Sequence, residues 1–89
     1  MDTLGLLEEC LQLVRDLGYE IREEPLGELA GGGCVVGGRR VFLLNLEHGP
    51  AERLDHLLRL LAMTPEAAEL PKSRLLASRL GRLRSESRL

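Results

Sequence analysis

With 89 residues and a net charge of −2, the chain has enough length for one domain with a thin core. It contains 22 leucines, but Tyr19 and Phe42 are its only aromatic residues, so no aromatic platform for stacking a base or a sugar is expected. The acidic N-terminus does not resemble a secretory signal, no apolar run reaches about 18 residues, and two cysteines are too few for a disulfide framework. We therefore expect a cytoplasmic protein without membrane contact or cofactor.

An amphipathic helix is predicted over residues 3–17. Apolar residues recur at helical spacing from Leu4 to Val14, and polar residues fill the opposite face. Gly18 ends the helix, because glycine accepts the left-handed conformation of a helix cap. The alternating segment Tyr19–Glu24 then predicts a strand with one solvated face.

A β-hairpin is predicted after a loop over residues 26–33. Gly37 and Gly38 separate two β-prone runs, and a two-residue glycine turn permits the positive φ angles that hairpins require. The second run, Val41–Leu46, is apolar on both faces apart from Asn45. Such a strand is usually central in its sheet or covered on both sides.

Three helical segments are predicted after the hairpin. Pro50 suits the first turn of one helix, and Thr64-Pro65-Glu66 starts a short second one that reaches Leu70. Lys72–Arg84 predicts a last, basic helix, and Ser85–Leu89 is expected to fray. Since consecutive strands usually pair, the fold expected is α+β, with a three-stranded antiparallel meander packed with an N-terminal helix and two to three C-terminal helices.

Charge is distributed unevenly along the chain. Residues 1–71 carry 13 acidic and 6 basic side chains, a balance of −7, whereas residues 72–89 carry 6 basic and one acidic, a balance of +5. We interpret 1–71 as a compact acidic body and 72–89 as a basic helix and tail of the same domain, docked on its own body or on that of a second copy. Eleven arginines, one lysine and two side-chain amides are typical of a thermophile or a GC-rich genome.

The sequence offers weak candidates for a metal site. Glu52 and His56 are one helical turn apart and share a face, but a zinc site needs three or four ligands. His48, Cys34 and Cys10 would have to supply the others, and their spacing does not bring them together. The sequence therefore favours a surface histidine paired with Glu52, two apolar cysteines, and no catalytic residue.

The segment from Leu17 to Ala62 resembles the front half of metalloprotease-like domains of the ImmA/IrrE type. The similarity lies in the order of features: a helix end, a strand, a glycine-led hairpin closing in an asparagine, and a helix at HGPAERLDHLLRLLA. The family's H-E-x-x-H motif overlays on His56-Leu57-Leu58-Arg59-Leu60, so the general base and the second zinc ligand are both replaced by leucine. The layout is also similar to small bacterial proteins of unknown function with the same glycine-led hairpin. The resemblance implies a related fold without zinc chemistry.

The function expected from the sequence is protein–protein contact, with a homodimer as the first hypothesis and an unidentified protein as another partner. Apolar side chains exceed what one thin core needs, and surplus apolar surface usually marks an interface. The interface residues predicted are Val41, Leu43, Leu60, Leu76, Leu80 and Leu83.

Two alternatives remain open. A regulatory nucleic-acid-binding protein would use the basic residues of the last helix, although an acidic body disfavours nucleic acid. Those residues are Arg74, Arg79, Arg82 and Arg84. An enzyme or the remnant of one, such as a degenerate zinc-metallopeptidase-like domain, would centre on His56, Glu52 and Cys34.

Overall fold

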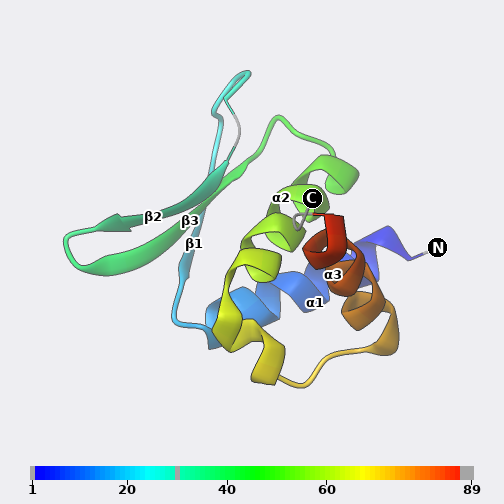
Figure 1. Cartoon of the computed structure of the whole chain (residues 1–89). Helices are drawn as coiled ribbons and strands as arrows, with labels where there is room; N and C mark the ends of the chain where they lie inside the picture. The colour runs from blue at the N-terminus through cyan, green and yellow to red at the C-terminus, as the bar shows by residue number, and fades with distance from the viewer. Residues whose placement is uncertain (1, 30, 87–89) are drawn as a thin grey trace.

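In the computed structural model, residues 2–29 and 31–86 are described, and they form three α-helices, one short 3₁₀-helix and one three-stranded sheet (Figure 1). The α+β class predicted from the sequence is confirmed. In chain order the elements are α1 (Thr3–Asp16), β1 (Glu20–Glu24), β2 (Gly32–Val36), β3 (Arg39–Asn45), α2 (Pro50–Met63), the 3₁₀-helix η1 (Pro65–Glu69) and α3 (Arg74–Glu86).

The helix boundaries follow from local chemistry. The Asp2 side chain caps α1 by accepting a hydrogen bond from the Gly5 backbone N–H at 2.8 Å, and Gly18 follows the helix with a φ of 91°. Pro50 occupies the first turn of α2, where its missing N–H costs no helical hydrogen bond. The last helix begins two residues later than predicted, at Arg74, and includes Ser85. Residues 87–89, also predicted to fray, lie outside the described residues.

The sheet is mixed, and the predicted antiparallel meander is not confirmed. Its strand order is β1-β3-β2, with β1 parallel to β3 and β2 antiparallel to β3. The most apolar strand takes the centre, where both of its backbone edges are paired and its side chains are shielded on both sides. Burial of β3 therefore prevails over the tendency of consecutive strands to pair, which would have placed β2 in the middle.

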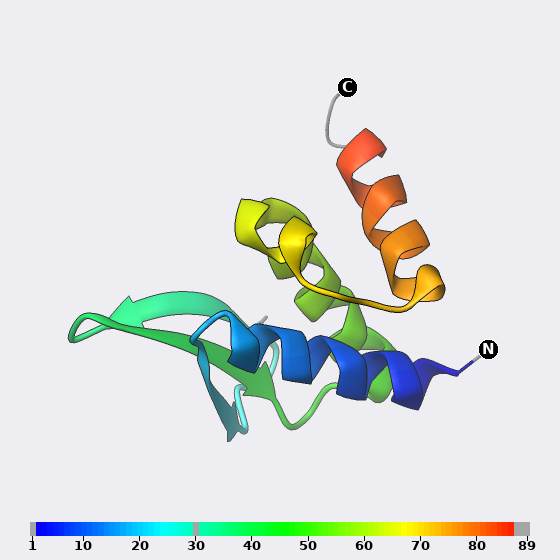
Figure 2. The ribbon, with the colours of Figure 1, turned by 90° about the horizontal axis from the view of Figure 1, so that it is seen from below.

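Glycines shape the β2–β3 hairpin at two places. Gly37 and Gly38 have φ angles of 57° and 78°, which fit the two-residue turn predicted from the sequence. At the other end of the hairpin, a Cβ on Gly31 would collide with the backbone carbonyl of Leu43. The hairpin tip extends away from the helices in both views of the ribbon (Figure 2).

The core lies between one face of the sheet and the helices. Phe42 and Leu44 point from β3 into a buried cluster with residues of α1, α2 and α3, including Val14, Leu57 and Leu76. Alternation along the strand places Val41, Leu43 and Asn45 on the other face of the sheet. The helix α3 packs against α2. In the described part of the chain, every helix is too short or too polar to cross a membrane.

Candidate protein-interaction surface

The two outer edges of the sheet differ in chemistry. Within residues 2–29 and 31–86, β1 and β2 each pair with one strand only, so each leaves one edge open. The sequence of β1 is Glu-Ile-Arg-Glu-Glu, whereas β2 reads Gly-Gly-Cys-Val-Val and carries no charge. Natural sheets protect open edges with charged residues. Hence β1 has the protection typical of a free edge, and β2 lacks it.

An open groove of about 360 Å³ lies beside β2, between this strand and the C-terminal half of α2. We call it the β2 groove. Its walls are mainly apolar or backbone, and they include Tyr19, Gly33, Val35, His56, Leu60 and Met63. Val35 is 70% exposed and Met63 is 82% exposed, which are high values for large apolar side chains.

Glycine at position 33 brings the strand close to the helix. A Cβ on Gly33 would lie 3.3 Å from Cδ1 of Leu60 and 3.5 Å from Cε2 of Tyr19. The guanidinium of Arg40 lies 5.7 Å from the centre of the Tyr19 ring and donates a hydrogen bond to the Leu17 carbonyl. These contacts fix one wall of the β2 groove against the end of α1.

The residues predicted as an interface are divided by the structure into two groups. Val41, Leu76 and Leu80 are buried within the single chain, and Leu76 and Leu80 belong to its core. They supply no exposed surface to a second copy. Leu43, Leu60 and Leu83 are partly buried, and of these only Leu60 lines the β2 groove.

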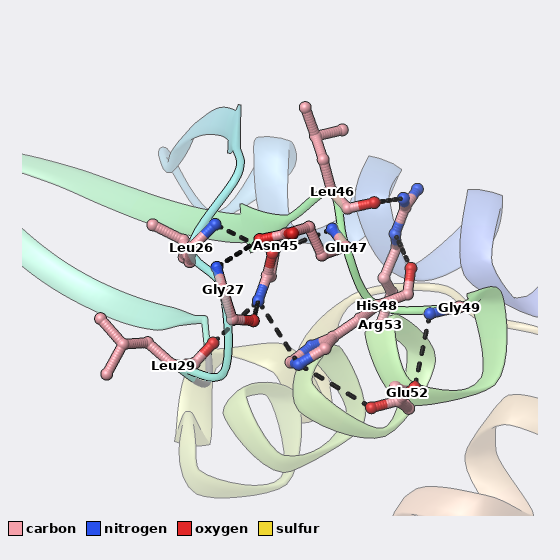
Figure 3. A network of polar contacts seen from close by, with 10 residues as sticks. All are labelled: Leu26, Gly27, Leu29, Asn45, Leu46, Glu47, His48, Gly49, Glu52 and Arg53. Atoms are coloured by element: carbon pink, nitrogen blue, oxygen red, sulfur yellow. Dashed lines mark hydrogen bonds and ion pairs between the residues drawn. The ribbon is translucent and has the colours of Figure 1, made fainter.

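A buried amide anchors the loop that precedes β2 (Figure 3). The side chain of Asn45 is 1% exposed, and its Nδ2 donates hydrogen bonds to the carbonyl oxygens of Gly27 (3.0 Å) and Leu29 (2.9 Å). Its Oδ1 accepts hydrogen bonds from the backbone N–H groups of Leu26 (3.1 Å) and Glu47 (2.9 Å). Asn45 thus ties the β1–β2 loop to the end of β3, and through this loop it positions β2.

The histidine and glutamate residues considered as metal ligands do not converge on one point. Glu52 lies beside His48, with 3.8 Å between Oε2 and Nε2, and its Oε1 accepts a long hydrogen bond from the Gly49 N–H at 3.5 Å. The rings of His48 and His56 are tilted against each other, with centroids 5.2 Å apart. Among the described residues, no group of three or more His, Cys, Asp or Glu side chains could hold a metal ion. Glu52 therefore pairs with His48, whereas the sequence predicted His56 as its partner.

The two cysteines occupy different environments. Cys10 is fully buried on α1, and this burial, together with the nearby Glu9 carboxylate, raises the pKa of its thiol to about 12. Cys34 is partly exposed in the middle of β2. The thiolate is the reactive form of cysteine, so Cys10 is the inert thiol and Cys34 the accessible one.

The four arginines proposed as a nucleic-acid contact surround α3. With about 100° between successive residues, Arg79 and Arg84 flank the apolar stripe of Leu76 and Leu80 on opposite sides. Arg84 also donates a hydrogen bond to the Ala62 carbonyl at 3.5 Å. Arg74 and Arg82 are exposed on the outer face of the helix. The four side chains therefore do not form one stripe along the helix.

The helix α2, for which the sequence suggested a resemblance to a zinc-binding helix, turns Leu57 into the core. Leu57, at the position of the general base, is fully buried in the core, whereas His56 and Leu60 line the β2 groove. No protein-family model matches the chain, and neither a curated protein nor a solved structure shows significant similarity to it.

Two features of this surface do not follow from the sequence analysis. Only the strand order identifies β2 as an edge, and this order depends on contacts between distant segments. One feature of the sequence indicated the role of Asn45: it is the single polar residue in the otherwise apolar segment Val41–Leu46. A polar residue in such a strand must find hydrogen-bond partners, and here the loop backbone supplies them.

Proposed function

We propose that this protein acts by protein–protein contact and that it self-associates as a homodimer through the outer edge of β2 and the β2 groove. The observation that carries the proposal is the contrast between the two edges of the sheet. The open edge of β2 is formed by five uncharged residues, among them the exposed Val35, and the exposed Met63 lies nearby across the β2 groove. Charged side chains protect β1. Unprotected edge strands favour pairing with another strand.

The chemistry of the described residues also supports a binding role over catalysis. Among the described residues no metal-binding cluster forms, and the polar side chains that they place on the walls of the β2 groove are those of Tyr19, His56 and Arg59. Arg59 pairs with Asp55, with 2.9 Å between Nε and Oδ2. These groups do not form a nucleophile–base pair, so the groove offers apolar contact area and backbone hydrogen bonds.

Sedimentation velocity and light scattering between about 1 µM and about 1 mM test the proposal, because a short strand and a shallow groove favour a weak dimer. We expect the mass to rise from that of a monomer to twice that value as the concentration increases. A monomer of constant mass over this range would refute self-association.

Two matched substitutions locate the contact. Val35→Lys places a charge at the open edge and in the β2 groove, and we expect it to weaken dimerisation about tenfold or more. Leu29→Lys changes an equally exposed side chain, because Leu29 and Val35 are both 70% exposed, and it should leave dimerisation unchanged. Equal effects of the two substitutions would place the contact elsewhere.

A further inference from the structure

We propose that two copies of the chain pair their β2 strands antiparallel, about a two-fold axis that passes beside Cys34. This inference rests on the proposed homodimer and specifies its register. The partner is a second copy, because the two glycines at the start of β2 would lie opposite the two valines at the end of an antiparallel copy. The argument combines the register of the hairpin, the order of small and large residues in β2, and the shape of the β2 groove.

The register of the hairpin determines which backbone groups of β2 face outward. The two-residue turn makes Val36 and Arg39 the first pair of the ladder, and Val35 then lies opposite Arg40 and Cys34 opposite Val41. In a hairpin with such a turn, the first pair is hydrogen-bonded, and hydrogen-bonded and non-hydrogen-bonded pairs then alternate. The N–H and C=O groups of Gly33 and Val35 are consequently directed away from β3, toward the open edge.

These outward groups select one register for a symmetric pair. When β2 meets an antiparallel copy of itself, the register that pairs all five residues is centred on Cys34, the middle residue of Gly32–Val36. In this register Gly33 of one copy lies opposite Val35 of the other. Both residues direct their hydrogen-bonding groups outward, so the register satisfies the alternation of the ladder.

The same register matches large side chains with small ones. Val35 lies opposite Gly33 on the face of the sheet that carries the helices, and Val36 lies opposite Gly32 on the other face. Val35 and Val36 are 70% and 52% exposed in the single chain, whereas the glycines leave space beside them. Each valine of one copy therefore fills a position that has no side chain in the other, which is the self-complementarity that a two-fold interface requires.

The β2 groove receives the partner's side chain on the helical face. Gly33 forms its floor, and Leu60 and Tyr19 lie directly above this glycine. The partner's Val35 side chain, opposite Gly33, would enter the groove beside Leu60 and toward Met63. Because the two-fold axis is perpendicular to the sheet, the helices of both copies lie on the same side of a continuous six-stranded sheet.

Disulfide trapping provides the test, since the two Cys34 residues form a non-hydrogen-bonded pair on the axis. Cα atoms in such a pair are about 4.5 Å apart, within the range of about 4.4–6.8 Å that a disulfide spans. Diamide would oxidise the two thiols to one disulfide, and the two electrons and two protons would pass to diamide. The variant Cys10→Ser leaves Cys34 as the only cysteine.

We expect Cys10→Ser to form covalent dimer about tenfold faster than a control whose only cysteine lies on the exposed residue 68, because pairing gives the thiols a high effective concentration. The control carries Cys10→Ser, Cys34→Ser and Ala68→Cys. Equal rates would overturn the proposed register.

A mixing experiment tests the register with different residues. One protein carries Gly32→Cys and the other Val36→Cys, both with Cys10→Ser and Cys34→Ser, and a Cβ on Gly32 meets no atom within 4 Å. We expect covalent heterodimer from the mixture and about tenfold less covalent dimer from either protein alone. If light scattering shows a dimer but neither trap forms, the register is wrong and the proposed homodimer stands. If every measurement shows a monomer, both are wrong.

Discussion

Asn45 and Leu29 are joined by a hydrogen bond of 2.9 Å from the side-chain Nδ2 to the backbone carbonyl, across 16 positions of the chain. This bond is one of four that the buried Asn45 amide makes with the backbone. Three of them reach the loop before β2, and the fourth reaches Glu47, just after β3. Polar backbone groups that turn away from solvent need hydrogen-bond partners, and Asn45 provides them here. The segment before β2 is therefore held by two side chains: Asn45 bonds to Leu26, Gly27 and Leu29, and the Glu47 carboxylate accepts a hydrogen bond from the Gly27 N–H.

Substitutions at Asn45 should destabilise the protein in a graded way. We expect Asn45→Ala to lower the free energy of unfolding by about 2–4 kcal/mol, because it removes four hydrogen bonds and leaves partly buried backbone groups without these partners. Asn45→Asp keeps the acceptor for the Leu26 and Glu47 N–H groups but turns a carboxylate oxygen toward two carbonyls. The loss of stability caused by Asn45→Asp should therefore be smaller at low pH, because the protonated carboxyl group can donate a hydrogen bond to one of these carbonyls. Urea unfolding at several pH values measures both effects, and a pH-independent loss for Asn45→Asp would contradict this explanation.

A contact between α1 and the start of α3 holds the basic helix on the body. The Glu9 carboxylate accepts hydrogen bonds from the backbone N–H and the Oγ of Ser73, both at 2.7 Å, and Ser73 Oγ accepts one from the Leu76 N–H at 3.1 Å. Ser73 is thus the N-cap of α3 and is itself positioned by α1. Ser73→Ala should cost about 1 kcal/mol, the usual value of a lost cap.

A double-mutant cycle of Glu9→Ala and Ser73→Ala separates the cap from the contact between helices. We expect a coupling energy of about 0.5–1.5 kcal/mol, since the two residues share two hydrogen bonds. Glu8→Ala, on an exposed neighbour, is the control and should change stability by less than about 0.5 kcal/mol. Additive effects of the two alanines would show that the contact contributes nothing beyond the cap.

The buried thiol of Cys10 makes stability depend on pH in the alkaline range. Burial and then the Glu9 carboxylate raise its pKa to about 12 from the usual value of 9.0. Above pH 9 the unfolded chain loses this proton while the folded chain keeps it, so stability falls as pH rises, by at most about 1.4 kcal/mol per pH unit. The loss continues until the pH passes the folded pKa of about 12.

Cys10→Ala isolates this contribution. All other ionisable groups are the same in the two proteins, so the difference between the two stability curves isolates the Cys10 thiol. We expect wild-type stability to fall more steeply than that of Cys10→Ala between about pH 9 and about pH 11, measured by urea unfolding. Parallel curves would show that the thiol ionises as easily in the folded protein as in the unfolded chain.

Local patterns predicted most of the secondary structure. The glycines at 37 and 38 predicted the hairpin turn, the apolar stripe predicted α1, and Pro50 and Pro65 predicted the starts of α2 and η1. Each of these signals depends on the backbone preferences of a few adjacent residues, which tertiary contacts did not override.

Long-range pairing was harder to predict. The apolar composition of β3 indicated a strand that is central or covered on both sides, and β3 is central, whereas the predicted meander would have placed β2 in the centre. Leu76 and Leu80, which were predicted as interface residues, are buried within one chain because the core includes α3. The apolar stripe of a helix shows which face of the helix is buried, but it does not show which element covers that face.

The acidic outer edge of β1 limits the size of any assembly that forms by strand pairing. Glu20, Glu23 and Glu24 would meet the same carboxylates of another molecule, and their repulsion would oppose further growth. Once the two β2 strands have joined, both remaining borders of the extended sheet are β1. Such a particle is closed at two subunits, and it cannot propagate into a fibril without first neutralising these carboxylates.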